Sequence, residues 1–433
     1  MAAIAVVYLA SQMQALDRTR TITKYMRERW GSEKGFPGGT VTAISQTSDG
    51  YLWIGTEKGL LRFDGMNFRT FPQATPLPVA IDAVRALVTD SEGNLWILLQ
   101  NTKILRYRRG RFELGRDEAE VGITAISKGR DGAVLLSSLA YGTLTYKEGK
   151  YEALEPSNRS AADAATAGTN DGVDTLSSHL AWATGVAAHR IAEPDSAVVS
   201  MAETGDGKMW LGTRDKGLFN LIGGHVSAVP NGKLAKNTTC LLPMEGGKLW
   251  IGTENGVEEW NGAELTQTSI PAAVRRSKVL TMIRDRDHNV WMGSDSGLLR
   301  VNSEGVSADE SGSENSGAIT ALFEDREGNL WAGGEGDIER LRDGAFVSYS
   351  LGSLQKESSG PIYVDAKGQA WFAPFEGGLH WMKDGKTGSV TNDGLNEDVV
   401  YSITGSKNEL WIGRQRGGLT HLRYGGASIS TKT

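Results

Sequence analysis

Few side chains in this sequence have the types and spacing that catalysis or metal binding requires. The six histidines share no spacing typical of metal ligands, and they are His179, His189, His225, His288, His380 and His421. The single cysteine, Cys240, rules out an internal disulfide and a cysteine-based metal site. Neither a Gly-x-Ser-x-Gly elbow nor a glycine-rich phosphate-binding loop occurs. We therefore expect a non-catalytic protein with no metal site and no cofactor.

Asp-Gly pairs recur along the chain and suit either calcium loops or tight turns. They include Asp49-Gly50, Asp131-Gly132 and Asp206-Gly207. A calcium loop needs further acidic ligands at fixed positions after the first aspartate, and the sequence lacks them here. Aspartate that bonds to its own backbone, followed by glycine with positive φ, is typical of hairpin turns. We therefore interpret these pairs as turns.

The residues best suited to hold a ligand are basic, polar and aromatic side chains at variable positions between repeated segments. Arginine and lysine there could bind a carboxylate or a sugar acid, and phenylalanine could stack on a ring. The candidate ligand-binding residues are Arg214, Lys216, Phe375, Glu376, Arg414, Gln415 and Arg416. Solvated loops contain the same residue types, so any one of these residues alone is also compatible with a loop that binds nothing.

A phrase that recurs about every 40 residues places these loops. It reads Asp-Gly-Tyr-Leu-Trp-Ile-Gly-Thr at 49–56 and Gly-Lys-Leu-Trp-Ile-Gly-Thr at 247–253. Eight of the chain's 12 tryptophans share one register, and they are Trp53, Trp96, Trp210, Trp250, Trp291, Trp331, Trp371 and Trp411. From Trp210 onward the intervals are 40, 41, 40, 40 and 40 residues. A fixed period in this range indicates a repeat architecture.

Each repeat has the pattern of a four-stranded antiparallel sheet. In the first repeat, alternating residues at 41–47 predict one strand, and 52–56, 60–63 and 67–71 predict three more, each bounded by a glycine turn. Such a sheet buries too little surface alone, whereas sheets arranged radially cover one another. We therefore predict an all-β fold, a β-propeller with the repeated tryptophan between adjacent blades. The glycine two residues later would allow a close approach by the neighbouring blade.

About ten repeat units can be followed, and closed rings of about 4–8 blades are usual. We favour a seven-bladed ring plus three further blades over one nine- or ten-bladed ring. The unit near Val173–Ile191 is degenerate, and Asn302–Gly317 lacks the apolar fourth strand of the Trp291 unit. The N-terminal strand at 21–30 has no local partner. We predict that it closes a first propeller over 16–307, and that 316–433 forms further blades of an incomplete second propeller.

Bulk composition is that of an ordinary water-soluble domain. The net charge of −6 over 433 residues argues against a nucleic-acid-binding surface. Residues 1–15 are mildly apolar and resemble the core of a signal peptide, which favours export to the periplasm or the cell exterior; a cytoplasmic location is the alternative. No stretch reaches the ~18 apolar residues that a membrane-spanning helix needs.

The passage from Ile22 to Gly65 joins a tyrosine and a tryptophan to Gly-Phe-Pro and a Val-Thr-Ala-Ile strand, and a similar pattern returns at Asp393–Val400. This arrangement resembles the two-component regulator propeller family over nearly the whole chain. The resemblance implies an exported sensor domain, commonly followed by a membrane helix and a histidine kinase or diguanylate cyclase. The chain stops at Thr433 without those segments, so we expect a fragment or a binding unit with a separate output partner.

Three functions follow from these observations. The first is a non-catalytic sensor propeller that recognises a small molecule, such as an oligosaccharide, on one face. The second is a propeller enzyme such as a lyase, which would need histidine and carboxylates converging at the ring mouth. The third is a scaffold for protein–protein interaction, which any propeller can support.

Overall fold

The computed structural model describes most of the chain. The described residues are 16–71, 80–114, 122–138, 142–147, 150–153, 197–222, 225–309, 317–344, 360–374, 377–383, 386–406, 408–424 and 430–432. The signal-like segment 1–15, the degenerate unit near Val173–Ile191 and the candidates Phe375 and Glu376 lie outside them.

The first repeat forms a four-stranded antiparallel sheet, blade 1, as its pattern predicts. Its strands, paired in chain order, are β2 (Val41–Gln46), β3 (Leu52–Thr56), β4 (Gly59–Phe63) and β5 (Phe68–Phe71). Alternation in β2 buries Val41 and Ile44. Gly50 in the following turn has φ 92°, a conformation that glycine adopts without strain. Alternation and turn chemistry together therefore produce the meander.

Five more sheets, blades 2 to 6, have the same strand order. Their strands are β6 (Val84–Thr89), β7 (Leu95–Leu99), β8 (Ile104–Arg108) and β9 (Arg111–Leu114); β10 (Ile123–Lys128), β11 (Val134–Ser138), β12 (Gly142–Lys147) and β13 (Lys150–Ala153); β14 (Val198–Glu203), β15 (Met209–Thr213), β16 (Leu218–Ile222) and β17 (His225–Ala228); β18 (Thr238–Pro243), β19 (Leu249–Thr253), β20 (Gly256–Trp260) and β21 (Leu265–Thr266); β22 (Val279–Arg284), β23 (Val290–Ser294), β24 (Gly297–Asn302) and β25 (Gly305–Ala308). The helical elements of the described residues are single 3-10 turns, η1 (Ile22–Lys24), η2 (Ser32–Lys34), η4 (Gly232–Ala235), η5 (Glu245–Gly247) and η6 (Asn392–Gly394).

Blade 7 combines strands from distant parts of the chain. Its strands are β26 (Ile319–Glu324), β27 (Leu330–Gly334), β28 (Ile338–Arg342) and the N-terminal β1 (Met26–Trp30). β1 pairs antiparallel with β28, with Met26 opposite Arg342 and Trp30 opposite Ile338. The first unit therefore extends to Ala345, beyond the boundary at 307 that the sequence predicts.

The predicted and observed boundaries differ because of the polar segment that follows β24 in blade 6. The sequence predicts no fourth strand there, but Gly305, with φ 121°, turns the chain back and β25 pairs with β24. The Trp291 sheet is thus complete without the N-terminal strand. The Trp331 sheet, which the sequence places among the further blades, accepts β1 instead.

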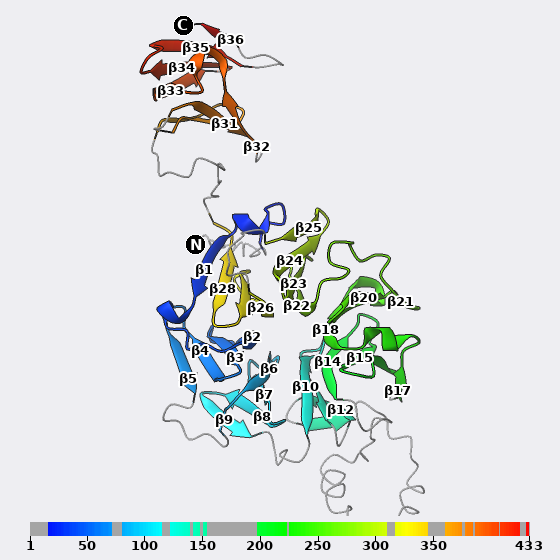
Figure 1. Ribbon diagram of the computed structural model, residues 1–433. Coiled ribbons are helices and arrows are strands. Elements are labelled where there is room, and N and C mark those ends of the chain that lie inside the picture. The colour runs from blue at the N-terminus through cyan, green and yellow to red at the C-terminus, as the bar shows by residue number, and fades with distance from the viewer. Residues whose placement is uncertain are drawn as a thin grey trace, which may run out of the picture. The chain divides into compact units, whose positions relative to one another are not determined.

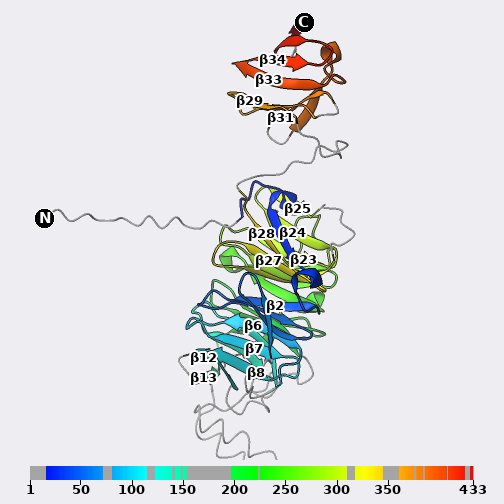
Figure 2. The same cartoon turned by 90° about the vertical axis from the view of Figure 1, so that its left-hand side faces the viewer.

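The seven blades of this unit form a ring. Their first strands β2, β6, β10, β14, β18, β22 and β26 contact one another in that order, and β26 contacts β2. Figure 1 shows these strands nearest the centre of the ring, with β5, β9, β17, β21 and β25 at its periphery, and Figure 2 shows the same ring from the side. The prediction of a β-propeller is confirmed.

The repeated tryptophans lie between blades, as predicted. Trp53 packs with Leu95 and Ile97 of blade 2, and Trp331 packs with Ile54 of blade 1. The glycine two residues later provides the close approach, because a Cβ on Gly55 would lie 2.5 Å from Val84 Cγ1. Tryptophan and glycine of the repeated phrase are thus scaffold residues.

A polar residue six positions before the tryptophan fixes its indole. The Oδ2 atoms of Asp90, Asp285 and Asp325 each accept the indole N–H at 2.8 Å, and Thr47 and Thr204 do so through Oγ1 at 3.0 and 2.9 Å. The same aspartates bind backbone amides of the turn, as Asp285 Oδ1 does with Asn289 N at 2.8 Å. These carboxylates and hydroxyls therefore serve the hairpin and the interblade core.

Residues 346–433 belong to a second compact unit, in which the structure describes two four-stranded sheets. Their strands are β29 (Ile362–Val364), β30 (Ala370–Phe372), β31 (Leu379–Lys383) and β32 (Lys386–Val390), and β33 (Val400–Ser406), β34 (Glu409–Arg414), β35 (Leu419–Arg423) and β36 (Ser430–Lys432). Three further blades were predicted, and the first of the three is blade 7 of the ring. Trp371 is fully buried, whereas Trp411 is 42% exposed.

Candidate functional site

The two ends of the ring carry different loops. At one end lie the turns between second and third strands and the connections between blades, such as Glu57-Lys58 and 80–83; we call it the connection end. At the other lie the turns between first and second and between third and fourth strands, such as Asp49-Gly50 and Arg109-Gly110; we call it the hairpin end. The sequence places the candidate ligand contacts at the connection end, because loops there vary while the framework repeats.

Every first strand of the ring has a β-bulge at its second residue, next to the connection end. The bulged residues of blades 1 to 7 are Thr42, Arg85, Thr124, Val199, Thr239, Leu280 and Thr320. Three of the threonines donate to the first-strand carbonyl of the next blade: Thr42 to Val84, Thr239 to Val279 and Thr320 to Val41, at 2.6, 2.6 and 2.5 Å. A bulge changes the direction of a side chain, and in these three blades the threonine points to the first strand of the next blade.

Arg85 is the one charged residue at these seven bulges. Its side chain is half-buried, and it has no hydrogen bond or ion pair with any described residue. Burial and then repulsion by Arg214 lower the pKa of the Arg85 guanidinium. The two arginines come from blades 2 and 4, and both lie at the connection end. Sequence reasoning selects Arg214 and misses Arg85, whose only sequence signal is its place at the start of a first strand.

Arg214 and Lys216 lie in the exposed turn between β15 and β16. The Arg214 carbonyl accepts the amide of Asn237 at 2.7 Å, which ties this turn to the connection that leads into blade 5. The Lys216 amide donates to Thr213 Oγ1 at 3.2 Å. The backbone of the turn is therefore held, and the Arg214 side chain has no ion pair among the described residues.

The other described candidates lie in the second unit. Arg414 is buried, and its Nε lies 3.7 Å from Asp398 Oδ2. Burial opposes ionisation of Asp398, but amide hydrogen bonds from Gly417 and Arg416 lower the pKa of its carboxyl. Gln415 and Arg416 are exposed. Arg414 is therefore part of a turn held by Asp398, in a different unit from Arg214 and Lys216.

Arginines at the hairpin end are paired across blade junctions. Arg130 Nη1 donates to the Gly205 carbonyl at 2.7 Å, Arg286 Nε to Glu324 Oε1 at 2.6 Å, and Arg326 Nη2 to the Thr47 carbonyl at 2.6 Å. Each bridge joins one blade to the next. The structural role of these three guanidinium groups is therefore to hold neighbouring blades together.

A cavity of about 280 Å³ lies at the connection end between blades 6 and 7. The two arginines that line it are already paired: Arg27 Nη2 lies 2.7 Å from Asp309 Oδ2 and also bonds to Glu339, and Arg29 Nε donates to Asp337 Oδ2 at 2.9 Å. Burial disfavours the charge of Arg27, but the bonds to Asp309 and Glu339 raise its pKa. These pairs hold β1 against blades 6 and 7.

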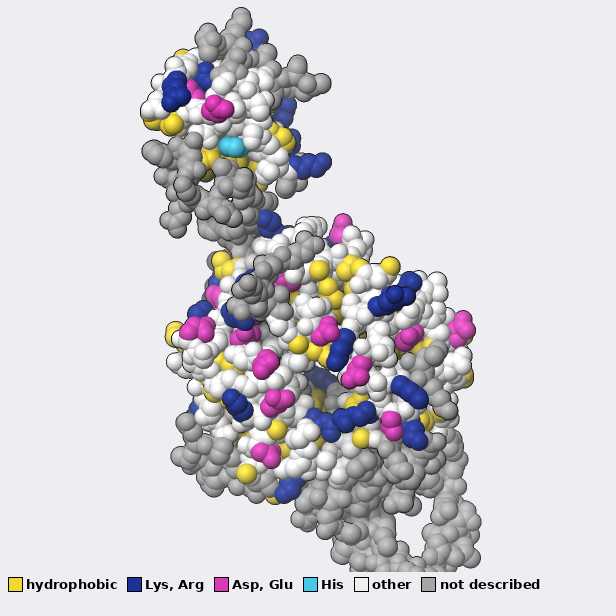
Figure 3. Space-filling view, in the orientation of Figure 1, with side chains coloured by type: hydrophobic (Ala, Val, Ile, Leu, Met, Phe, Trp, Pro, Cys, Tyr) yellow, Lys and Arg dark blue, Asp and Glu magenta, His cyan; other side chains and the backbone are white. Residues whose placement is uncertain are grey.

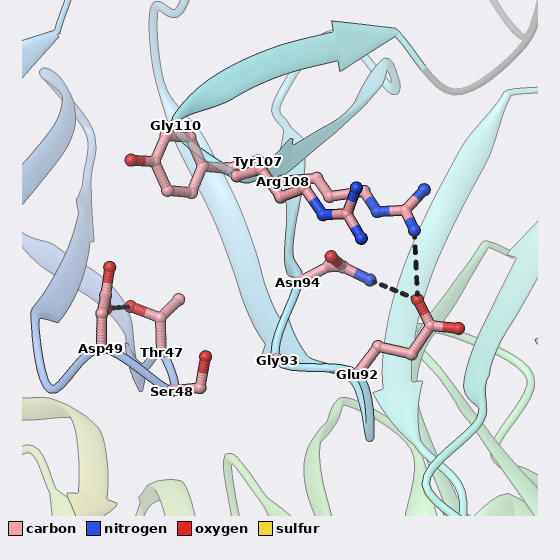
Figure 4. A pocket seen from close by; sticks show the side chains of 10 residues that line it. Thr47, Ser48, Asp49, Glu92, Gly93, Asn94, Tyr107, Arg108 and Gly110 are labelled. Carbon is pink, nitrogen blue, oxygen red and sulfur yellow. Dashed lines mark hydrogen bonds and ion pairs between the residues drawn. The ribbon is translucent and has the colours of Figure 1, made fainter.

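A second cavity of about 320 Å³ lies at the hairpin end between blades 1 and 2 (Figure 4). Asn94 Nδ2 donates to Glu92 Oε2 at 3.2 Å, and Arg108 Nη2 lies 3.9 Å from the same oxygen. On the opposite wall, Thr47 donates to Asp49 Oδ1 at 2.5 Å. Its polar groups thus bond mainly within their own turns.

The two histidines that a lyase would need lie in the second unit. The ring of His421 stacks on Trp411, and its Nε2 lies 3.3 Å from Glu409 Oε2 in the same sheet. His380 Nδ1 bonds with Ser389 Oγ at 2.9 Å, and burial lowers its pKa. Among the described residues, no group of three or more His, Cys, Asp or Glu side chains has the geometry to hold a metal ion.

Comparison with known proteins identifies the repeats. The model of the two component regulator propeller family matches residues 35–58, 192–215 and 313–336. These three segments are therefore similar to two component regulator propeller repeats. The first and third matches cover the starts of blades 1 and 7, and the second ends in the turn that contains Arg214.

Solved structures extend the likeness to nearly the whole chain. A domain described as the extracellular part of the hybrid two component system BT3049 from B. thetaiotaomicron matches with a TM-score of 0.66 at 19% identity, over 94% of this chain and 54% of that one. A streptogramin B lyase matches over 76% of this chain and 100% of its own, with a TM-score of 0.53 at 14% identity. YCF48 bound to D1 peptide matches over 77% and 100%, with a TM-score of 0.52 at 12% identity. At these identities the likeness concerns the fold.

The chain spans about half the length of the two-component domain that it matches. A comparison with proteins of curated function finds no match. Within the described part of the chain, every helix is too short or too polar to cross a membrane.

Proposed function

We propose that this regulator propeller is the ligand-binding part of an exported sensor of two-component type. It recognises a small molecule, such as an oligosaccharide, at the connection end of the ring, without catalysis. Its output partner is a histidine kinase or a diguanylate cyclase. The observation that carries the proposal is the regulator propeller repeat, found in a chain that matches an extracellular two-component domain over 94% of its length.

The distribution of contacts supports the connection end as the binding face. At the hairpin end, Arg130, Arg286 and Arg326 are paired across blade junctions. At the connection end, Arg85 and Arg214 have no paired charge among the described residues. Figure 3 shows a hollow at the centre of the ring on the face turned to the viewer, with both basic and acidic side chains around it. A rigid ring with variable loops is a common arrangement for a binding site.

Site-directed blocking separates the two ends. Ser296→Cys places a thiol in an exposed turn of the connection end, and Glu327→Cys places one in an exposed turn of the hairpin end. The natural Cys240 interferes little, because burial raises the pKa of its thiol to about 12. Each variant is coupled to a bulky maleimide and screened against oligosaccharides and organic acids by thermal shift and calorimetry.

We expect at least one compound to bind the unlabelled protein, and its binding to be lost with the label at Ser296→Cys but kept with the label at Glu327→Cys. Loss with the second label alone would move the binding face to the hairpin end. If no small molecule binds while a protein partner is retained in a pull-down, the scaffold function replaces the sensor. Export is tested by fractionating cells that express the chain from Met1.

A further inference from the structure

The two described sheets of the second unit pack on each other and leave two outer faces of opposite kind. Trp371 of the β29–β32 sheet packs with Leu410 and Ile412 of the β33–β36 sheet, which is the blade junction of the ring repeated. We propose that the two outer faces bind each other between copies of this chain, head to tail. This self-association goes beyond the proposed function and does not depend on the ligand.

One outer face, the tryptophan face, lies on the β33–β36 sheet and contains Trp411 and Leu419. Trp411 is 42% exposed, whereas the six tryptophans at this register position in the ring are 0–6% exposed. In the ring the next blade covers this side, as Trp53 and Leu60 pack with Val84 of blade 2. Leu419 is 62% exposed, whereas the residues at its position in blades 1 to 7 are 0–3% exposed: Leu60, Ile104, Thr143, Leu218, Val257, Leu298 and Ile338.

The other outer face, the entry face, lies on the β29–β32 sheet and contains Ile362 and Phe372, which are opposite each other on neighbouring strands. In the ring the preceding blade covers this side, as Ile44 packs with Trp331 of blade 7. Val364 follows on the same face of the strand and is 59% exposed. Ile362 is 70% exposed, whereas the residues at its position in blades 1 to 7 are 5–9% exposed: Ile44, Leu87, Ile126, Met201, Leu241, Met282 and Leu322.

A second copy of the chain is the partner that suits both faces. Exposed apolar patches on a soluble protein mark interaction sites. The ring of the same chain does not supply the partner, because its first strands contact one another all the way round and the tryptophan, or Leu135 in blade 3, is buried in each of its blades. Each copy of the second unit, in contrast, carries one tryptophan face and one entry face, the two sides that meet at every blade junction.

The proposed contact is heterologous, because it joins different surfaces of identical chains, and it can close into a ring. Each copy contributes the two described sheets of its second unit. Three copies would give six sheets and four copies would give eight, within the range of about 4–8 blades at which propeller rings close. The assembly therefore continues an interface that the structure already contains, between Trp371 and the β33–β36 sheet.

The test uses the full chain and three single variants. Leu419→Asp places a charge on the tryptophan face and Ile362→Asp places one on the entry face, where burial of a carboxylate without a partner opposes contact. Met66→Asp is the matched control, because Met66 is 78% exposed and lies between β4 and β5 of the ring. Mass in solution is measured by sedimentation over a dilution series. Thermal melting of the dilute proteins verifies folding, which we expect to be kept because Leu419 and Ile362 are mostly exposed within one copy.

We expect the unmodified chain and Met66→Asp to approach three or four times the 46.6 kDa of one chain as the concentration rises. Leu419→Asp and Ile362→Asp should each remain monomeric alone. Mixed together they should form a 1:1 complex, because the first variant keeps its entry face and the second keeps its tryptophan face. Such complementation is specific to a head-to-tail contact.

An unmodified chain that stays monomeric at every concentration overturns the inference, and so does association that both face variants retain. If Leu419→Asp abolishes association and Ile362→Asp does not, two tryptophan faces meet each other, which also overturns a head-to-tail contact. A mixture of the two variants that contains no complex overturns it as well. None of these results bears on ligand binding by the ring, so the proposed function is tested separately.

Discussion

Replacement of Trp30 by alanine tests how the ring is closed. Trp30 lies on β1 and is 8% exposed. Its ring stacks on Trp331 of blade 7 at 5.4 Å between centroids and meets the edge of Phe63 of blade 1 at 5.2 Å. The guanidinium of Arg340 lies 5.6 Å from the same ring. One side chain from the N-terminal strand therefore joins the last blade of the ring to the first.

The expected cost follows from the buried area. A buried tryptophan covers about 150–250 Å² of apolar surface, which at about 25 cal/mol per Å² amounts to about 4–6 kcal/mol as an upper bound. Measured replacements of core aromatic residues by alanine cost about 3–5 kcal/mol. We expect Trp30→Ala to lower the free energy of unfolding of the first unit by the latter amount.

Cys240 makes the first unit observable on its own. It is the only cysteine of the chain, it lies on β18 in blade 5, and burial raises the pKa of its thiol to about 12. A short pulse of iodoacetamide after equilibration in urea therefore modifies mainly molecules whose first unit has opened. With a urea slope of about 3 kcal/mol per M, Trp30→Ala should shift the midpoint of Cys240 modification down by about 1 M or more.

Trp411→Ala is the matched control for this experiment. Trp411 has the same place in the repeat as Trp331 but lies in the second unit and is 42% exposed. Its removal should leave the Cys240 curve unchanged. A midpoint shift below about 0.3 M for Trp30→Ala, or an equal shift for both variants, would refute closure of the ring by β1.

Three further predictions concern single contacts. Gly55→Ala should cost about 1–3 kcal/mol, because its Cβ would lie 2.5 Å from Val84 Cγ1, whereas Gly205→Ala, which meets nothing within 4 Å, should change the melting temperature little. Asp285→Ala should cost about 3 kcal/mol in urea unfolding, since it leaves a buried indole N–H and a buried amide without their acceptor. Hydrogen bonds from Lys208 and then Thr204 lower the pKa of Asp206 to about 2, below its ordinary value of about 3.9. Its stabilising effect is therefore present above about pH 4 and lost as the pH falls toward 2, and Asp206→Asn should flatten the stability profile in that window.

Much of the framework can be predicted from local sequence. The tryptophan register, the glycine turns and the alternation at 41–47 predict the four-stranded sheets, because strand faces and turn types depend on residues close together in the chain. The interblade position of Trp53 also follows, since a large apolar side chain repeated in each sheet is best buried between sheets. The interpretation of Asp49-Gly50 as a turn is supported by the bond from Thr47 to Asp49.

Only the tertiary structure decides which sheet β1 completes. An outer strand edge offers the same row of backbone donors and acceptors in every blade, so the sequence cannot rank the edges. The turn at Gly305 gives blade 6 its own fourth strand, and β1 pairs with β28. The repeat therefore determines the blade, and long-range pairing determines the ring.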